Sequence, residues 1–411
     1  MGVFISGYRM DSNESFSDIV ELPIEFEKVP TNQPVTVIEP EPMVSYAVEP
    51  TTPNTVKTFD GPSTDLKSTQ VVPTLETPIT NGGNAVWCST FLAAWKSLAV
   101  DVAQVDISLE GAPQSAVLLT KADDPRPYVP TGALYVATGW KNEDVIERIG
   151  KEMKVAFPGK QPPTFPGIAQ DSFVAYAYLE ANVKFTLPYF QNGNPLEFTD
   201  SAGRKTKVTS FGIRPVDEYA YYQLRSQPRI LFRKGGRSDA DLEFAVDLCE
   251  DSSPSQIVVA RIKREPTLRA ALQRVENEVS VLQDLKKKDP NYAINLGGIG
   301  PNDVFLVPDF FWQISHRFSE LEGRSFLNPK LKGQRLDVAQ QDILFRMDRS
   351  GAELKLESRM YCRPVPTHFV LDRPFLIFMQ KRGATEPYFA MWIDNGELLT
   401  PWKRDKLGTG K

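Results

Sequence analysis

Apolar and polar positions alternate with a period of two through much of the chain beyond residue 170, and this pattern predicts many β-strands. Strands are expected in SFVAYAYLEANVKF, RKTKVTSFGI, LEFAVDL, SQIVVARI, NDVFLVPDFFWQI, QQDILFRM, RPFLIFM and EPYFAMWI. Several of these runs are apolar on both faces, which is typical of central strands in a sheet that is covered on both sides.

A helical period predicts helices in only three segments. They are WCSTFLAAWKSLAV, NEDVIERIGKEMKVAF and EPTLRAALQRVENEVSVLQDLKKK. In the third segment, one apolar stripe runs through Leu268, Leu272, Val275, Val279 and Leu282. Many strands mixed irregularly with few helices, without βαβ alternation, predict an α+β fold.

The N-terminal part differs from the rest of the chain in amino-acid composition. Up to about Ala85 it is rich in Pro, Thr, Ser and Glu, and it holds 12 acidic and 4 basic residues, leaving 40 acidic and 43 basic residues elsewhere. Such a segment resists both helices and ladders. The sequence predicts a disordered acidic arm at 1–80, with a partner-binding arm as the alternative, then a domain at 81–402 and a flexible tail at 403–411.

Composition excludes several classes of function. The net charge of −5 argues against a nucleic-acid binder, and the absence of a long apolar run argues against a membrane protein. Three scattered cysteines, Cys88, Cys249 and Cys362, favour a reducing compartment over a disulfide scaffold. With only His316 and His368, a metal centre or a hydrolase triad has few candidate residues. We therefore expect no enzyme activity, no metal and no cofactor.

Two glycine clusters are interpreted as turns. NLGGIGPND, with Gly297, Gly298 and Gly300, lacks the GxGxxG spacing and the Lys-Ser/Thr ending of phosphate-binding loops. RKGGRS, around Gly235 and Gly236, is typical of a basic hairpin turn.

The C-terminal third resembles the signature region of the serpins. In that family a strand leads to a hinge glycine, then to an exposed reactive loop, then to a segment of the form F-x-x-D-x-P-F and further apolar strands. Gly351 and Glu353 match the hinge pattern G-T-E, and Phe389 is similar to the closing strand. The closing motif is matched by Phe369, Asp372, Pro374 and Phe375.

Weaker matches follow the family's order upstream, so that the resemblance spans about residues 80 to 400. Asn84 precedes the first helix, VPDFFWQI resembles the P-x-F strand, and LQRVENEV resembles a helix pattern L-x-x-L-E-x-x-L. The other matching positions are Phe185, Pro188, Tyr189, Phe198, Val208 and Ser210. The resemblance implies a serpin-like α+β fold with a large central mixed sheet, further sheets and eight or nine helices.

For function, the resemblance implies a serine-type endopeptidase inhibitor whose partner is a serine or cysteine protease. In an inhibitory member, the protease cleaves the loop, forms an acyl-enzyme, and the freed hinge enters the main sheet as a new strand. The hinge here comprises Arg349, Gly351, Ala352, Glu353, Leu354 and Leu356. The candidate reactive bonds follow Arg359, Arg363 and Val365, although Pro364 and Pro366 are poor residues on the leaving side.

Other residues favour a non-inhibitory binding or structural protein. Leu354 and Leu356 stand where inhibitory members usually have alanine, and Arg349 and Ser350 replace the usual glutamate pair. Large side chains at inward positions would slow strand entry. Both readings stay open, and in either case we expect a monomer. Unpaired thiols and the lack of a recognisable signal peptide favour the cytoplasm, whereas most serpins are extracellular.

Overall fold

The largest element is a mixed sheet of seven strands. The computed structural model describes residues 64–165, 170–181, 183–214, 219–235, 242–289, 297–349 and 367–403. In spatial order the strands are β1 (Thr69–Val71), β2 (Asn84–Cys88), β17 (Pro387–Ile393), β16 (Phe375–Lys381), β11 (Ser255–Arg261), β10 (Glu243–Asp247) and β9 (Arg229–Lys234). β1 and β2 are parallel, and the other neighbours are antiparallel.

Smaller sheets surround it. A four-stranded sheet has the order β15 (His368–Val370), β12 (Val304–Pro308), β8 (Ser210–Ile213) and β5 (Phe190–Gln191). Three pairs complete the set: β13 (Phe310–Arg317) with β14 (Gln340–Met347), β3 (Leu134–Trp140) with β4 (Phe173–Leu179), and β6 (Leu196–Thr199) with β7 (Lys205–Val208). The predicted α+β class with a large mixed sheet is confirmed.

The described residues contain fewer helices than expected. They hold α1 (Ser89–Ser97), α2 (Gln114–Lys121), α3 (Val145–Ala156), α4 (Tyr219–Ser226) and α5 (Leu268–Lys288). A π-helical turn (Leu98–Ala103) extends α1, and four short 3₁₀ segments lie at Arg126–Tyr128, Lys141–Glu143, Pro329–Leu331 and Gly396–Leu398. Between α1 and β3, Pro113, Pro125, Pro127 and Pro130 limit helix length because proline lacks an N–H group. Over the described residues, the five α-helices are thus fewer than the eight or nine expected.

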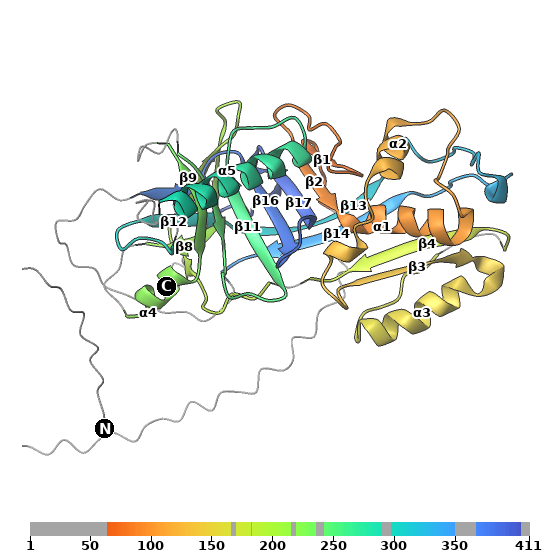
Figure 1. The fold of residues 1–411 in the computed structure, drawn as a ribbon, viewed down its shortest axis with the longest axis horizontal. Coiled ribbons are helices and arrows are strands. Elements are labelled where there is room, and N and C mark those ends of the chain that lie inside the picture. Colours follow the sequence, from red (N-terminus) through yellow and green to blue (C-terminus); the bar gives the residue numbers. More distant parts are fainter. Residues whose placement is uncertain are drawn as a thin grey trace, which may run out of the picture. The chain divides into compact units, whose positions relative to one another are not determined.

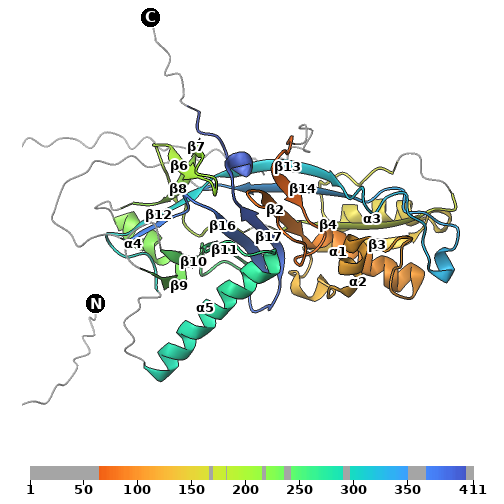
Figure 2. The same cartoon turned by 90° about the horizontal axis from the view of Figure 1, so that it is seen from above.

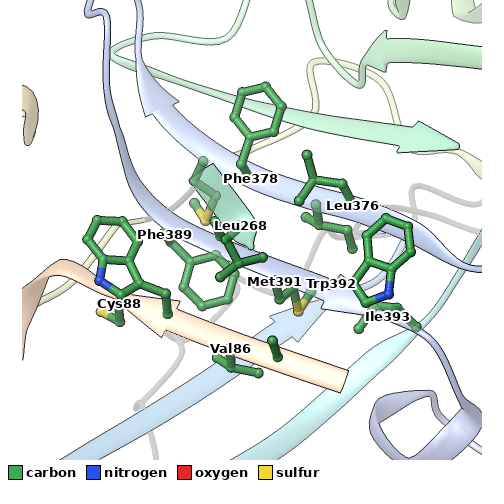
Figure 3. Packing of buried hydrophobic residues seen from close by; sticks show 14 of the residues in the cluster. Val86, Cys88, Leu268, Leu376, Phe378, Phe389, Met391, Trp392 and Ile393 are labelled. Carbon is green, nitrogen blue, oxygen red and sulfur yellow. The ribbon is translucent and has the colours of Figure 1, made fainter. Parts of the chain in front are cut away.

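The two sides of the large sheet are covered by different elements (Figures 1 and 2). α5 lies on one side, and the β13/β14 pair lies on the other. The Phe345 ring on β14 stacks on Phe389 of β17 at 5.0 Å, and Phe310 on β13 contacts Phe375 of β16 edge to face. All seven residues of β17 are buried, including Trp392 (Figure 3). Burial on both faces explains why this strand is a continuous apolar run.

α3 has a small core of its own above the β3/β4 pair. Its buried residues Val145, Ile149 and Met153 pack with Ala137 of β3 and Val174 of β4. This cluster is separate from the main core. The helix predicted in NEDVIERIGKEMKVAF is confirmed, and it covers the β3/β4 pair rather than the seven-stranded sheet.

The folded region begins earlier than residue 81. β1 pairs with β2, and Val71, Val72 and Leu75 are buried in the main core. The fully buried Asn84 amide holds this start in place: its Nδ2 donates to Asn395 Oδ1 (2.9 Å), and its Oδ1 accepts from the Asp394 N–H (2.8 Å). Residues 64–80, which were assigned to the arm, therefore belong to the fold. Residues 1–63 and 404–411 lie outside the described residues.

α5 has the N-cap that its sequence allows. The Thr267 hydroxyl accepts a hydrogen bond from the Ala270 N–H at 3.1 Å, and Leu268, Ala271, Val275 and Leu282 are buried below. The cap satisfies one of the amide groups that the first turn leaves without a helical partner.

We predict that Thr267→Ala lowers the free energy of unfolding by about 1 kcal/mol, because the cap is lost while the packing of α5 is kept. Urea denaturation followed by circular dichroism measures this loss. Thr267→Ser is the matched control, since it retains the hydroxyl. Equal stability of the alanine and serine variants would contradict the capping role.

Candidate functional site

The candidate site is built around the two ends of segment 350–366. Arg349 precedes the segment and Thr367 follows it, and both are described. We call the residues before it the upstream root (β14 to Arg349) and those after it the downstream root (Thr367 to Phe375). The predicted hinge and reactive-bond residues Gly351, Ala352, Glu353, Leu354, Leu356, Arg359, Arg363 and Val365 lie outside the described residues.

The upstream root is a strand with one buried and one exposed face. Along β14 every second residue is buried, and the buried set comprises Gln341, Ile343, Phe345 and Met347. β14 pairs with β13 from Gln340 opposite Arg317 to Met347 opposite Phe310. Beyond the strand, the Arg349 carbonyl accepts a hydrogen bond from the Tyr189 N–H at 3.3 Å. Of the predicted hinge residues, Arg349 is thus placed at the end of β14.

The downstream root is fixed by backbone bonds to β12. The buried Thr367 donates its N–H to Asp303 Oδ1 at 2.8 Å, and its carbonyl accepts from the Val304 N–H at 3.0 Å. His368, Phe369 and Val370 then pair in parallel with Val304, Phe305 and Leu306.

A buried arginine locks the closing motif. Arg261 Nε donates to the Leu242 carbonyl (2.9 Å), and its Nη1 donates to the Val370 carbonyl (3.0 Å) and to Asp372 Oδ1 (3.3 Å). The guanidinium lies 5.2 Å from the centre of the Phe244 ring, which meets Phe369 edge to face at 5.3 Å. Arg261 is only 5% exposed, so these bonds offset the loss of its hydration.

The last residue of the closing motif, Phe375, is the first residue of β16 in the seven-stranded sheet. The Asp372 carbonyl accepts from the Thr199 N–H at 2.8 Å, and Pro374 immediately precedes β16. The fully buried Phe375 contacts Phe198 and Phe310 edge to face. Phe369, Asp372, Phe375 and Phe198, which the sequence singled out, are thus brought together with Arg261 and Phe244, which it did not.

Asp309 joins the two roots. It lies between β12, which pairs with β15, and β13, which pairs with β14. Its side chain is 8% exposed, and Oδ2 accepts from Gln191 Nε2 at 2.9 Å, whereas the buried Oδ1 has no hydrogen-bond partner among the residues that the structure describes. Burial raises the pKa of Asp309, and the charge of Asp348 raises it further, against the opposing effect of Thr209 and Gln191.

An edge of strand β4 lies beside β14. Figures 1 and 2 show β4 next to β14, running in the same direction, with α1 in contact with both strands. Within the described ranges β4 pairs only with β3, and β14 only with β13. Burial raises the pKa of Tyr176 on β4 to about 12, with a smaller contribution from the charge of Asp342 on β14. The two strands therefore lie close together without pairing.

Gln341 attaches β14 to the start of α1. Its Nε2 donates to the Cys88 carbonyl (3.1 Å) and to Thr90 Oγ1 (2.8 Å). β14 is thus bonded to the start of α1 through Gln341 and pairs with β13 along one edge. Its other edge faces β4.

The histidines and cysteines do not form a reactive centre in the described part of the chain. His316 packs against Phe318 at 4.7 Å, and burial lowers its pKa, while His368 lies on β15. Cys88 and Cys249 are buried free thiols, and burial raises the pKa of Cys88. Over the same residues, no group of three His, Cys, Asp or Glu side chains could hold a metal ion. Among the described helices, none has the length and apolarity needed to cross a bilayer.

Comparisons with solved structures return serpins. Serpin48 of the insect Tenebrio molitor is 12% identical, with 76% of this chain and 92% of its own covered, at a TM-score of 0.38. Thyroxine-binding globulin in complex with thyroxine is 11% identical, with 77% and 94% covered, at 0.42. Human glycosylated kallistatin is 14% identical, with 77% and 92% covered, at 0.40.

No protein-family model and no curated protein matches the sequence.

We predict that Asp309→Asn stabilises the protein at neutral and alkaline pH. Because the pKa of Asp309 is raised in the folded state, folding favours its protonated form. The stability of the native protein therefore falls as the pH rises from the unfolded to the folded pKa, and asparagine avoids that loss. The gap between the two proteins, of order 1 kcal/mol for a buried unpaired group, should close in acid.

Thermal unfolding of both proteins across pH measures this gap. Asp337→Asn is the matched control, because Asp337 is exposed and pairs with Arg335 at the surface. An Asp309→Asn variant that is less stable than the native protein at neutral pH, with the difference closing in acid, would show that the ionised carboxylate is favourable.

Proposed function

We propose that this protein inhibits a serine or cysteine protease by offering segment 350–366 for cleavage and then inserting its upstream part between β4 and β14. The observation that carries the proposal is the placement of the two neighbouring edges at the start of the segment. β4 and β14 run in the same direction, and Arg349 at the end of β14 accepts a hydrogen bond from Tyr189, which follows β4 along the chain.

The geometry suits a strand that folds back. A chain leaving β14 at Arg349 and reversing direction would run antiparallel to both β14 and β4, so its N–H and C=O groups could bond to either edge. The downstream root supports the same scheme from the other side, because the bonds of Thr367, Phe369 and Asp372 would hold the released end in place.

The proposed chemistry needs only the protease's own nucleophile. Its serine hydroxyl or cysteine thiol attacks a carbonyl carbon in segment 350–366, the C–N bond breaks, and the new amine takes the proton. The upstream part remains bound to the protease as an ester or thioester. Insertion then carries the protease along and distorts it before water can hydrolyse the acyl bond.

A non-inhibitory binding or structural role is the second candidate, favoured by the residues after Gly351. In an extended strand, Leu354 and Leu356 would share a face with Ala352 and Ser358, and Glu353, Lys355 and Glu357 would lie on the other face. Insertion would turn the leucines toward a packed layer, where additional volume commonly costs about 1–3 kcal/mol and would slow entry.

We predict that incubation with trypsin-like serine proteases and papain-like cysteine proteases yields a covalent complex that survives denaturing electrophoresis. Cleavage should also raise the unfolding temperature, because an inserted strand adds hydrogen bonds at two edges. Mass spectrometry of the released fragment identifies the bond among those after Arg359, Arg363 and Val365. Stoichiometric cleavage with neither a complex nor a rise in unfolding temperature would favour the non-inhibitory role.

The leucines can be tested within the same assay. Leu354→Ala and Leu356→Ala together should raise the ratio of covalent complex to cleaved free protein by several-fold, since smaller inward side chains enter a sheet faster. Lys355→Ala is the matched control, because it shortens a side chain on the opposite face of the same strand. If Lys355→Ala raises the ratio as much as the leucine variants, the effect does not depend on the inward face.

A further inference from the structure

The outer face of the β13/β14 pair exposes two large apolar side chains. Phe311 of β13 is 56% exposed, and Leu344 of β14 is 49% exposed. Phe311 lies opposite Arg346, and Leu344 lies opposite Gln313, so Phe311 and Leu344 are diagonal neighbours on one face. Side chains at such a diagonal are close enough to interact. We call these two side chains the Phe311 patch.

The first described residue, Thr64, lies beside this patch. Its N–H donates to the Gln313 carbonyl at 2.7 Å, and its Oγ1 accepts from the Gln313 N–H at 3.3 Å. In an antiparallel pair, the backbone groups of alternate residues point away from the partner strand. Thr64 is therefore fixed at the edge of β13 that points away from β14, at the residue opposite Leu344.

The side chain of Gln313 also indicates that the neighbouring chain covers this face. Its Oε1 is buried and has no hydrogen-bond partner among the residues that the structure describes. Buried amide oxygens normally accept a hydrogen bond. Because Thr64 is bonded to the backbone of the same glutamine, the chain just before Thr64 is close enough to supply a donor, either a backbone N–H or the Ser63 hydroxyl.

The sequence before Thr64 favours a turn away from the strand edge. Pro62 has no N–H group and cannot continue a ladder along β13, and the dipeptide Gly61-Pro62 is typical of a turn. The nearest large apolar side chain upstream is Phe59. Five residues span up to about 17 Å, whereas two residues along a strand span only about 7 Å, so Phe59 can reach the Phe311 patch.

We propose that segment 56–63 docks on the outer face of the β13/β14 pair. The Phe59 ring packs against Phe311 and Leu344, and a polar hydrogen of the segment is donated to Gln313 Oε1. The docking is independent of the proposed inhibitory function, because it requires neither cleavage nor insertion of segment 350–366.

The competing occupant of the patch is a second copy of the chain, since exposed apolar surface also forms contacts between molecules. The tether at Thr64 favours the chain's own segment. A short tether gives an effective concentration in the millimolar range, which exceeds the concentration of free protein in a dilute solution. Docking would attach the N-terminal part of the chain to β14, the strand that leads to segment 350–366.

Thermal unfolding of the full chain in a double-mutant cycle tests the proposal. Phe59→Ala and Phe311→Ala should each lower the unfolding temperature by about 2 °C, as expected for the loss of one aromatic pair. The double variant should lose clearly less than the sum of the two single losses, because both substitutions remove the same contact. Phe311 is exposed, so its replacement leaves the core intact, and circular dichroism verifies folding.

Phe26→Ala is the matched control, because Phe26 is a phenylalanine that lies much earlier in the same N-terminal region. Its effect should be additive with that of Phe311→Ala. The proposal is overturned if Phe59→Ala leaves the unfolding temperature unchanged or if the losses from Phe59→Ala and Phe311→Ala add in full. It is also overturned if sedimentation shows a dimer that Phe311→Ala dissociates, since a second copy would then cover the patch.

Discussion

The stretch Val304–Arg317 holds both ends of segment 350–366, and the candidate site depends on that constraint. Its first part pairs with β15 and its second with β14. At the junction, the Asp309 N–H donates to the Thr209 carbonyl (3.0 Å) and the Asp309 carbonyl accepts from the Thr400 N–H (2.9 Å). Because the junction is bonded on both sides, the two roots cannot separate unless β12 or β13 breaks, so a cut between them leaves both ends attached.

The two roots differ in how they are held. The downstream root is held by a buried guanidinium, an edge-to-face ring pair and backbone hydrogen bonds. Removing one hydrogen-bond partner from such a set leaves another buried polar group unsatisfied, which lowers the free energy of unfolding by about 1–3 kcal/mol. The upstream root ends in a strand that pairs on one side within the described ranges. Near it, Asp309 keeps a buried oxygen without a hydrogen bond. The described contacts thus hold the downstream root on several sides, whereas the upstream root ends in a strand that pairs along one edge.

Local periodicity predicted the elements with a regular apolar pattern, but it missed α2, α4, β3 and β9, and it did not predict which elements are in contact. The alternation of apolar and polar residues in QQDILFRM correctly predicted β14, and the apolar stripe from Leu268 to Leu282 correctly predicted α5. Both patterns can be recognised within one short stretch of sequence. β1 was missed because its three residues lie in a Pro- and Thr-rich stretch and become a strand only beside β2.

The residues that complete the site carry no local signal either. Arg261 in the apolar run SQIVVARI resembles an ordinary strand-end arginine, and Asp309 resembles a surface acid between two strands. Their burial follows from partners more than 100 residues away, Asp372 for Arg261 and Gln191 for Asp309. The family resemblance identified Phe369, Asp372 and Phe375 as a motif. Only the fold shows why they are spaced in this way: Phe369 and Phe375 lie on strands of two different sheets, and the buried guanidinium of Arg261 binds the chain between them.

Within the described residues no strand lies between β4 and β14, and an open strand edge can accept a strand from another molecule. The exposed face of β14 carries the polar residues Gln340, Asp342 and Arg346 together with Leu344. The covalent connection between segment 350–366 and β14 also disfavours pairing with another molecule. Segment 350–366 is tethered to β14 at Arg349, and a short tether gives an effective concentration in the millimolar range, above that of any free competitor. If the proposed cleavage and insertion take place, the tether favours the chain's own strand over a strand from a second molecule.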